Sequence, residues 1–473
     1  MRKTKIVCTL GPASKSEEVM EAMLKNGMSV ARLNFSHGTH EDHKKTIETF
    51  RRVRDRLHMP AAIMLDTKGP EIRIGTFKNG KITLSRGDRF VFTTEACDGD
   101  ETHVFVNYDG LPAEVKAGTR LLLDDGKAVL SVVETTEKTV VCRAENDCVL
   151  SDRKSINIPY THLNLPFISK RDEEDLLFGI AEDVDFVAAS FVRTKEDVIA
   201  LRKFLDYHGG HRIRIIAKIE NNEGVENFAA ILRHADGIMV ARGDMGVEIP
   251  FERLPGIQKK FIRDCYRAGK MVITATQMLE SMIHSVTPTR AEITDVANAV
   301  FDGTSAVMLS GETAMGDHPA HVVHVMASIA EQAETDAFEM DAYGGLRFDE
   351  SKANVTNAIC DAAATTARDV DAAAIIAVTK TGSAARFVSK YRPPQIIIAA
   401  TPEEKSFHQL ALSWGVFPVL SLNQTDTDRL FMHAIDCAKM QDLVKAGDRV
   451  VITAGVPLNQ SGTTNILKVQ VVS

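Results

Sequence analysis

The chain has 473 residues, 44% of them hydrophobic and 25% charged, a composition typical of folded globular proteins. At roughly 150 residues per domain, this length predicts about three domains. The formal net charge of −8 argues against a protein that coats nucleic acid or a membrane surface, since both classes usually carry an excess of basic residues. No segment approaches the ~18 consecutive apolar residues of a membrane-spanning helix.

The seven cysteines are scattered along the chain, and none forms a Cys-x-x-Cys pair. This pattern predicts neither a zinc ribbon nor a disulfide framework. The apolar stretch behind the basic N-terminus is interrupted at once by Gly11-Pro12, so we expect no signal peptide. Together these features favour a reducing, cytoplasmic location.

Short apolar runs alternate with helix-length segments through residues 1–69 and 170–342. Continuous apolar runs are typical of buried parallel strands, and the helices between them indicate β-α units. Eight such units predict a (β/α)8 (TIM) barrel. The expected strands are 5–9, 28–34, 61–66, 185–191, 214–220, 237–242, 271–276 and 305–310.

Residues 70–169 interrupt this alternation between the third and fourth expected strands. Their short segments are rich in Val, Thr and Phe and are separated by turn signals such as Asn79-Gly80 and Asp109-Gly110. We therefore expect a small β domain inserted into a barrel loop, where an insertion need not disturb the core.

Residues 346–473 follow the linker-like Tyr343-Gly344-Gly345 and alternate again. A helical pattern precedes apolar runs that helix-length segments separate, which predicts a second α/β domain with a doubly wound sheet. The expected strands are 374–378, 395–400, 449–454 and 466–472.

In such a barrel the catalytic residues lie at the carboxyl ends of the strands and in the loops that follow them. Lys218 and Glu220 end the fifth strand two residues apart, so they share a face, and Asp244 follows the sixth strand. Glu220 and Asp244 from neighbouring strand ends make a coherent two-carboxylate magnesium or manganese site. The alternative is a structural ion pair at Lys218 and a simple tight turn at Asp244.

Polar residues also end the second, third and seventh strands. Arg32 is suited to bind a phosphate, because its guanidinium presents a fork of donors. The oxygen-bearing residues that follow suit a weakly bound hard cation, although Asn34 or Ser36 could instead cap the next helix. The residues are Asn34, Ser36, Asp66 and Thr67. Thr276 ends the seventh strand, where a threonine hydroxyl is usually just a satisfied polar group.

Eight segments in chain order resemble the pyruvate kinase family. They are TKIVCTLGPAS, ARLNFSHG, LDTKGPEIR, IIAKIENNEGV, DGIMVARGDMGVEIP, ITATQMLESM, PTRAEITDVANAV and DGTSAVMLSGETAMG, and a closing SGTTN matches as well. The resemblance is to bacterial-type members without an extra C-terminal domain. It implies a (β/α)8 barrel, an inserted small β-barrel lid and a C-terminal three-layer α/β domain.

The family moves phosphate from phosphoenolpyruvate to ADP and protonates the enolate to pyruvate, the last step of glycolysis. By resemblance, Lys218 would stabilise charge on the transferring phosphoryl group and Arg32 would clamp the phosphate. Glu220 and Asp244 would hold Mg2+ or Mn2+. The backbone at Gly243 and Asp244 would receive the substrate carboxylate.

Three more parts of the site are implied by the same resemblance. Thr276 would contact the substrate and support enolate protonation. The potassium ligands would be Asn34, Ser36, Asp66 and Thr67. Potassium-independent relatives carry a lysine at the position of Glu71, so the glutamate predicts potassium dependence.

The nucleotide contacts implied by the family are Arg73, Lys154 and His37. Here the chain departs from the family pattern Lys-Gly-Val-Asn-Leu-Pro-Gly, because Ser155 and Tyr160 replace the two glycines. Because a side chain replaces each glycine, we expect the backbone geometry near Lys154 and the movement of the lid to differ from the family pattern.

The C-terminal region implies a site for a phosphorylated allosteric effector and assembly into a homotetramer. Its hydroxyl-rich loop 379–383 opens a helix, and hydroxyls and amides at a helix N-terminus can bind an anion. The alternative is that this loop only caps the helix and that 461–465 forms an ordinary turn. Fructose bisphosphate, a sugar monophosphate and AMP all stay open as the effector. The expected residues are Thr379, Lys380, Thr381, Gly382, Ser383, Ser461, Gly462 and Thr463.

Two rival functions stay open from the sequence. A barrel lyase or aldolase could stabilise a pyruvate enolate with the same metal site, but would not need the β lid or the nucleotide-facing Arg73 and Lys154. A catalytically silent sugar-phosphate sensor would not need Lys218, Glu220 and Asp244 together.

Overall fold

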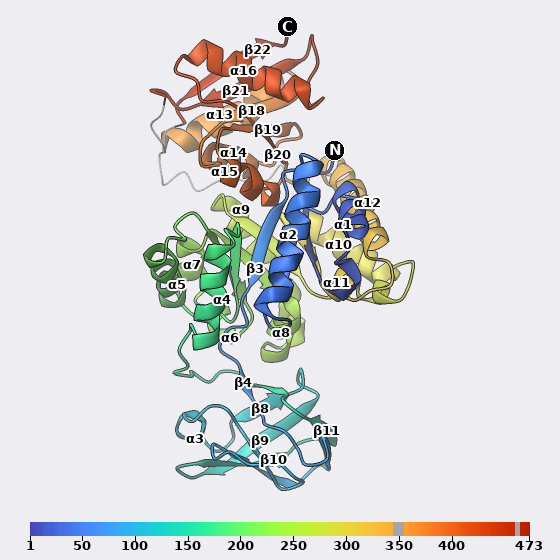
Figure 1. The fold of residues 1–473 in the computed structure, drawn as a ribbon, viewed down its shortest axis with the longest axis vertical. Coiled ribbons are helices and arrows are strands. Elements are labelled where there is room, and N and C mark those ends of the chain that lie inside the picture. Colours follow the sequence, from blue (N-terminus) through green and yellow to red (C-terminus); the bar gives the residue numbers. More distant parts are fainter. Residues whose placement is uncertain (344–353, 459–463) are drawn as a thin grey trace.

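A closed barrel of eight parallel strands forms the centre of the computed structural model, which describes residues 1–343, 354–458 and 464–473 (Figure 1). The barrel order is β1-β17-β16-β15-β14-β13-β3-β2, and each strand lies within its predicted range. The (β/α)8 prediction is confirmed. The strands are β1 (Lys5–Thr9), β2 (Val30–Asn34), β3 (Ala62–Asp66), β13 (Phe186–Ala189), β14 (Arg214–Ile219), β15 (Gly237–Ala241), β16 (Met271–Ala275) and β17 (Ala306–Leu309).

Helices cover the outside of the barrel. They are α1 (Glu17–Lys25), α2 (His40–Arg56), α4 (Lys170–Ala181), α5 (Lys195–Tyr207), α6 (Asn222–Glu226), α7 (Phe228–His234), α8 (Arg242–Glu248), α9 (Leu254–Arg267), α10 (Arg290–Phe301), α11 (Gly311–Ala314) and α12 (Pro319–Glu339), with 3-10 turns η1 (Pro12–Ser14), η2 (Phe251–Arg253) and η3 (Glu280–Ile283). Several begin at a polar cap: Thr39, Ser169 and Thr289 each accept a hydrogen bond from the backbone three residues on. These capping boxes satisfy backbone donors that would otherwise lack partners.

The inserted segment folds as β structure, as its turn-rich sequence predicts. Its elements are β4 (Ile72–Arg73), β5 (Lys81–Leu84), β6 (Arg89–Thr93), β7 (His103–Phe105), α3 (Leu111–Glu114), β8 (Arg120–Leu123), β9 (Ala128–Thr135), β10 (Thr139–Ala144), β11 (Cys148–Ser151) and β12 (Ser155–Asn157). Seven strands form a sheet in the order β4-β12-β8-β9-β10-β6-β7, and β11 pairs with β5. A bridge between Ile74 and Val106, just beyond the edge strands β4 and β7, curls the sheet toward a small barrel.

The C-terminal part is a three-layer α/β unit. Its elements are α13 (Val355–Asp369), β18 (Ala374–Val378), α14 (Ser383–Ser389), β19 (Ile396–Thr401), α15 (Glu404–Gln409), η4 (Leu410–Leu412), β20 (Val416–Leu420), α16 (Thr427–Met440), β21 (Arg449–Ala454) and β22 (Ile466–Val471). The sheet order is β20-β19-β18-β21-β22, with β22 antiparallel. Separate apolar clusters on its two faces include residues of α13 and α14 on one side and α16 on the other. Strand β20 was not predicted.

The barrel lies between the other two parts, with the C-terminal unit at the top and the lid at the bottom of Figure 1. The C-terminal unit covers the amino ends of the barrel strands: Lys5 of β1 donates to the Val416 carbonyl at 2.7 Å, and Leu412 joins the apolar cluster inside the barrel. The lid leaves the barrel after β3, at the opposite end. The domain boundaries 1–69 with 170–342, 70–169 and 346–473 stay predictions.

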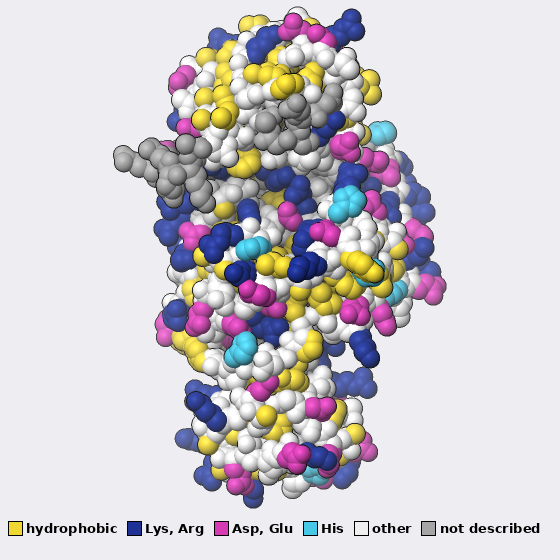
Figure 2. Space-filling view, turned by 90° about the vertical axis from the view of Figure 1, so that its left-hand side faces the viewer, with side chains coloured by type: hydrophobic (Ala, Val, Ile, Leu, Met, Phe, Trp, Pro, Cys, Tyr) yellow, Lys and Arg dark blue, Asp and Glu magenta, His cyan; other side chains and the backbone are white. Residues whose placement is uncertain are grey.

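Charges of both signs are interspersed over the described residues of the face in Figure 2. Among the described residues, no helix is long and apolar enough to cross a bilayer. Since the net charge is negative, an anionic ligand must be attracted by local groups of basic residues rather than by the molecule as a whole.

A buried lysine fastens the C-terminal unit to the barrel. Lys405 of α15 donates to the carbonyl oxygens of Asp183 and Val184 at 2.7 and 2.8 Å, and its ammonium lies 3.3 Å from the buried Asp185 carboxylate. Asp185 also accepts a hydrogen bond from Ile63 of β3. Burial raises the pKa of Asp185 although the Lys405 charge opposes the shift.

We predict that Lys405→Met strongly lowers the melting temperature, because it leaves the Asp185 carboxylate buried without its cation. Removing one partner of a buried pair costs about 3–5 kcal/mol. Asp183→Asn is the matched control: the Asp183 side chain is 77% exposed, so its ion pair with Lys405 should contribute less than about 1 kcal/mol. Equal thermal shifts for the two variants, measured by scanning fluorimetry, would contradict the role of Lys405.

Candidate active site

Lys218 and Glu220 lie at the carboxyl end of β14, and both are buried. The Lys218 ammonium lies 2.9 Å from a Glu220 oxygen, as expected for residues that share a strand face. It also lies 3.0 Å from Asp66 Oδ1 and donates a 2.6 Å hydrogen bond to Ser190 Oγ. The ion pair between Lys218 and Glu220, which was the alternative interpretation of the sequence, is present. It is part of a larger charge cluster that includes Asp66.

Asp66 is shared by two cations. Arg32 of β2 lies 2.6 Å from Asp66 Oδ2 and donates to Thr9 Oγ1 at 2.8 Å, while Lys218 takes the other Asp66 oxygen. Burial alone would raise the pKa of Asp66, but the charges of Arg32 and Lys218 outweigh it and hold that pKa low. In turn, burial would lower the pKa of Lys218, but Asp66 and Glu220 raise it. Lys218 therefore stays an ammonium ion.

Glu220 faces a different balance of charges. Burial raises the pKa of Glu220 to about 7; the Lys218 charge opposes that shift and the Asp244 charge adds to it. Its other oxygen accepts a 2.6 Å hydrogen bond from the Phe191 backbone. A carboxylate whose pKa is raised in this way, with a second carboxylate nearby, fits a divalent cation, which replaces the proton.

The number of protein ligands also fits magnesium. In the parts of the chain that the structure describes, no group of three His, Cys, Asp or Glu side chains is arranged to hold a metal ion. Glu220 and Asp244 would supply two carboxylates to such an ion, and substrate and water would complete the shell. That sharing is how Mg2+ is usually bound next to phosphate.

Thr276 and Gly243 are held together at neighbouring strand ends. The Gly243 N–H donates to Thr276 Oγ1 at 2.8 Å, and that hydroxyl donates to the Ala275 carbonyl at 2.6 Å. Thr276 has φ of +70°, a left-handed conformation that is rare for a β-branched residue and costs about 1–3 kcal/mol. Such strain is concentrated at functional sites.

Arg242, which the sequence reasoning did not single out, braces this loop. Its guanidinium lies 2.7 Å from Asp295 of α10 and donates to the Thr276 carbonyl at 2.5 Å. Arg242 directly follows β15, so the rule that placed Asp244 could also have found it.

The four residues expected to bind potassium come from adjacent strand ends. Asn34 and Asp66 are register partners of β2 and β3, and Thr67 Oγ1 accepts a hydrogen bond from Ser190 N at 3.1 Å. Asn34 Oδ1 accepts from Ser36 N at 3.1 Å. Neither Asn34 nor Ser36 caps the following helix, since the N-cap of α2 is Thr39. The capping alternative is wrong for both.

Of the expected nucleotide contacts, two lie together in the lid. Arg73 pairs with both oxygens of Glu71 at 2.8 Å, and Lys154 lies 2.7 Å from Asp124. Ile74 N donates to the Lys154 carbonyl, so the two segments are adjacent. His37 is on the exposed turn after β2; its carbonyl accepts from His43. Among the described residues, the polar partners of Arg73 and Lys154 do not include His37.

A cavity of about 380 Å³ opens between lid and barrel. Asp244 and Glu71 line it together with Ser155 and Tyr160, the two residues that depart from the family pattern. Tyr160 has φ of +60°, so it keeps a left-handed backbone of the kind that glycine adopts readily. Lys218 lies deeper and is not part of the lining.

A second cavity, of about 180 Å³, lies in the C-terminal unit. Thr379, Lys380, Thr381 and Ser383 line it, and Gly382 (φ +77°) precedes α14. These residues therefore lie together at one cavity, and their role in binding an effector stays a prediction. The other expected effector residues, Ser461, Gly462 and Thr463, lie outside the described residues.

Ser190 is the second residue that the sequence reasoning missed. It accepts from Lys218 and donates to the Thr67 carbonyl at 2.7 Å. It also packs against Gly69, where the lid begins: Gly69 has φ of +73°, and a Cβ there would lie 2.9 Å from Ser190 Cβ. Its position after β13 was the available signal.

Fold and site together define a (β/α)8-barrel enzyme with its charged groups at the carboxyl ends of the strands. Residues 1–323 match the family model "Pyruvate kinase, barrel domain", and residues 357–470 match "Pyruvate kinase, alpha/beta domain". The chain belongs to the pyruvate kinase family and is an enzyme of that family, which transfers phosphate from phosphoenolpyruvate to ADP. The lyase and sensor alternatives are thereby set aside.

Relatives from several organisms support this membership. The chain is 48% identical to the pyruvate kinase of Clostridium acetobutylicum over 473 residues, 100% of both chains. It is 48% identical to that of Staphylococcus haemolyticus, of which it covers 81%. The crystal structure of a pyruvate kinase from Cryptosporidium parvum matches with a TM-score of 0.93 at 40% identity, covering 100% of this chain and 96% of that one.

We predict that Ser190→Ala lowers kcat by about tenfold to a hundredfold, because the Lys218 ammonium loses a hydrogen bond of the charge-assisted kind, worth about 1.5–3 kcal/mol. Steady-state kinetics on the purified variant measures this. Ser389→Ala is the control: Ser389 is also buried, and it donates to the Trp414 carbonyl at 2.6 Å, in the C-terminal unit. A comparable kcat loss in both variants would show a general effect of lost stability instead.

Proposed function

We propose that the cluster around Asp66 is the place where phosphoryl transfer from phosphoenolpyruvate to ADP occurs, assisted by a divalent metal ion and K+, with protonation of the enolate to pyruvate. The observation that carries this proposal is the buried pair of cations, Arg32 and Lys218, on one carboxylate at the strand ends. Phosphoryl transfer needs mainly positioning and neutralisation of charge, which fixed cations supply.

Lys218 acts as a fixed positive charge in this proposal. Its raised pKa supports a permanent ammonium ion, which stabilises negative charge on the moving phosphoryl group and does not supply the enolate proton. Arg32, oriented by Asp66 and Thr9, clamps the same phosphate. The Thr276 hydroxyl has a supporting role in enolate protonation, since it lies against Gly243, whose backbone with Asp244 receives the substrate carboxylate.

Glu220 and Asp244 hold Mg2+ or Mn2+, and Asn34, Ser36, Asp66 and Thr67 hold K+. A bound divalent ion would neutralise charge on the substrate phosphate and the enolate oxygen. The raised pKa of Glu220 supports the assignment. It means that the buried carboxylate is stabilised when a positive charge binds to it, and a divalent ion supplies that charge.

Arg73 and Lys154 bind the nucleotide phosphates, with His37 on the barrel side. Both lid cations now pair with carboxylates, Glu71 and Asp124. Nucleotide binding must therefore exchange a carboxylate partner for a phosphate at each of them. Because the Arg73–Glu71 pair is bidentate, this exchange is costly for Arg73.

The 180 Å³ cavity binds a phosphorylated allosteric effector through Thr379–Ser383, with Ser461, Gly462 and Thr463 as further candidates. The gathering of hydroxyls and Lys380 on its wall supports an anionic ligand. By family resemblance we further propose a cytoplasmic homotetramer.

A coupled lactate dehydrogenase assay tests the reaction. Pyruvate should form from phosphoenolpyruvate only when ADP, Mg2+ and K+ are all present. Replacing K+ by tetramethylammonium should reduce the rate strongly, because Glu71 leaves the site without the lysine of potassium-independent relatives. Full activity in tetramethylammonium would contradict the potassium site.

The variant Lys218→Met belongs to the same test. It should suppress ADP-dependent turnover by about 10³-fold or more, while the circular dichroism spectrum stays that of the wild type. Unchanged turnover would overturn the role of Lys218.

Metal binding should depend on pH through Glu220. Its carboxyl is protonated below about pH 7 and must lose that proton when Mg2+ binds, so the affinity should fall about tenfold per pH unit below 7 and level off above it. Titration calorimetry with Mg2+ from pH 5.5 to 8 measures this. Glu220→Gln should bind Mg2+ weakly and without that slope; the same affinity at every pH would contradict the assignment.

A further inference from the structure

Strand β14 connects the two ends of the barrel through residues on one face. Arg214 begins the strand at the end covered by the C-terminal unit, and Lys218 ends it in the active site. Ile216, between them on the same face, packs in the apolar cluster inside the barrel. At ~3.3 Å per residue the two cations are about 13 Å apart along one strand.

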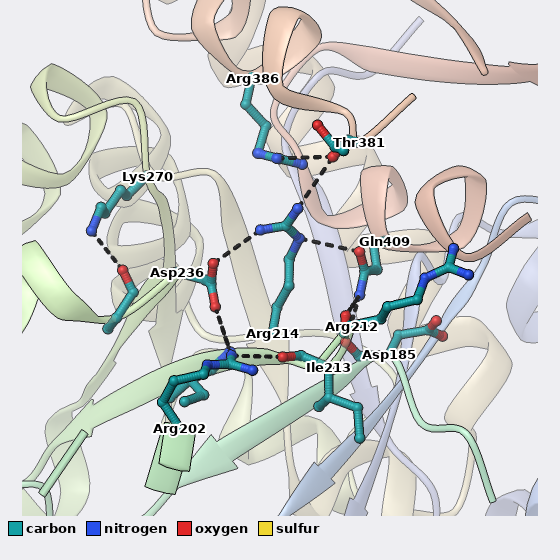
Figure 3. Close-up of polar contacts among 12 residues, drawn as sticks. Asp185, Arg202, Arg212, Ile213, Arg214, Asp236, Lys270, Thr381, Arg386 and Gln409 are labelled. Atoms are coloured by element: carbon teal, nitrogen blue, oxygen red, sulfur yellow. Dashed lines mark hydrogen bonds and ion pairs between the residues drawn. The ribbon is translucent and has the colours of Figure 1, made fainter. Parts of the chain in front are cut away.

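The Arg214 guanidinium contacts three partners from three separate segments of the chain (Figure 3). Nε donates to Gln409 Oε1 of α15 at 3.1 Å, and Nη1 lies 2.9 Å from Asp236, just before β15. Nη2 donates to the carbonyl oxygen of Thr381 at 3.2 Å. Thr381 also lines the 180 Å³ cavity, so this hydrogen bond joins the cavity wall to the barrel.

The same carbonyl oxygen has a second guanidinium partner. Arg386 of α14 donates to it at 3.0 Å, and Figure 3 shows both arginines converging on Thr381. Burial, and then the nearby Arg214 charge, lower the pKa of Arg386 to about 9. The two arginines thus face each other across one acceptor, and a shift of that acceptor changes both contacts.

The barrel side of this contact is held firmly. Asp236 accepts from the Ile215 backbone at 2.9 Å, so the carboxylate partner of Arg214 is tied to β14 itself. Gln409 donates from its amide to the carbonyl oxygens of Asp185 and Arg212 at 3.0 and 2.8 Å. Arg214 cannot follow a movement of Thr381 without straining β14 or losing this bond.

We propose that Arg214 is a positioning residue that couples the Thr379–Ser383 loop to Lys218 through strand β14. This rests on the proposed function, in which that loop binds the effector and Lys218 serves the phosphoryl group. A ligand that binds differently to two positions of the loop shifts the balance between them, and the strand carries the shift to the active site. Because coupling is reciprocal, substrate binding must also alter the loop.

Hydrogen–deuterium exchange tests this reciprocity without any effector. The full chain is compared with and without saturating phosphoenolpyruvate, in Mg2+ and K+ and without ADP. In the wild type we expect the substrate to change the exchange rate of segment 379–386 by about fivefold or more. In Arg214→Gln the response should vanish while kcat stays within about twofold, because Arg214 contacts neither substrate nor Lys218.

Arg212→Gln is the matched control. Arg212 crosses the same interface to Glu403 at 3.3 Å, but both side chains are largely exposed and neither contacts Thr381. It should keep the wild-type response. Arg214→Lys, for use if the glutamine variant does not fold, keeps a charge for Asp236 but cannot bond Thr381 and Gln409 as well, so its response should be reduced. A wild-type response in Arg214→Gln, or none in the wild type, overturns the proposal.

A second measurement separates this inference from the effector site. Fructose 1,6-bisphosphate is the probe, and its binding is measured by calorimetry beside its effect on half-saturation by phosphoenolpyruvate. We expect Arg214→Gln to bind the probe as the wild type does but to lose the effect on half-saturation. If the wild type does not bind fructose 1,6-bisphosphate, this compound is not the effector. The role of Arg214 is then decided by the hydrogen–deuterium exchange experiment, which uses phosphoenolpyruvate and no effector.

Discussion

The shared Asp66 carboxylate is the interaction on which the rest of the site depends. A carboxylate so buried would normally take up a proton, but Arg32 and Lys218 keep it ionised; in turn it orients both side chains and keeps Lys218 charged. The barrel makes this possible, because only closed parallel strands bring residues 32, 66 and 218 to one rim. Lys218 therefore stays an ammonium ion, which under the proposed function suits it to stabilise charge rather than to transfer a proton.

Much of this could be predicted from alternation alone. Residues two apart on a strand share a face, which placed Lys218 beside Glu220, and each barrel strand fell in its expected range. The assignment of roles came instead from the family resemblance, since a Lys–Glu pair at a strand end is equally compatible with a structural ion pair. The pair proved to be both bonded and part of a larger charge cluster.

What could not be predicted depends on contacts between distant segments. Ser190 is an ordinary hydroxyl in the sequence, and only folding brings it against Lys218, 28 residues later. Strand β20 contains Pro418, which argues against a strand except at a sheet edge, and β20 is an edge strand. Helix capping was an alternative role for Asn34, but the turn places Thr39 at the start of α2.

Gly69 limits how the lid can be exchanged between proteins. Its left-handed backbone lies against Ser190 with no room for a side chain, and its N–H donates to Asp172 of α4 at 3.0 Å. A chimera that joins a foreign lid here must therefore retain Gly69 and begin beyond it. A side chain at position 69 would press on the Cβ and carbonyl oxygen of Ser190, the residue whose hydroxyl accepts from Lys218, so a foreign residue there would disturb the surroundings of that lysine.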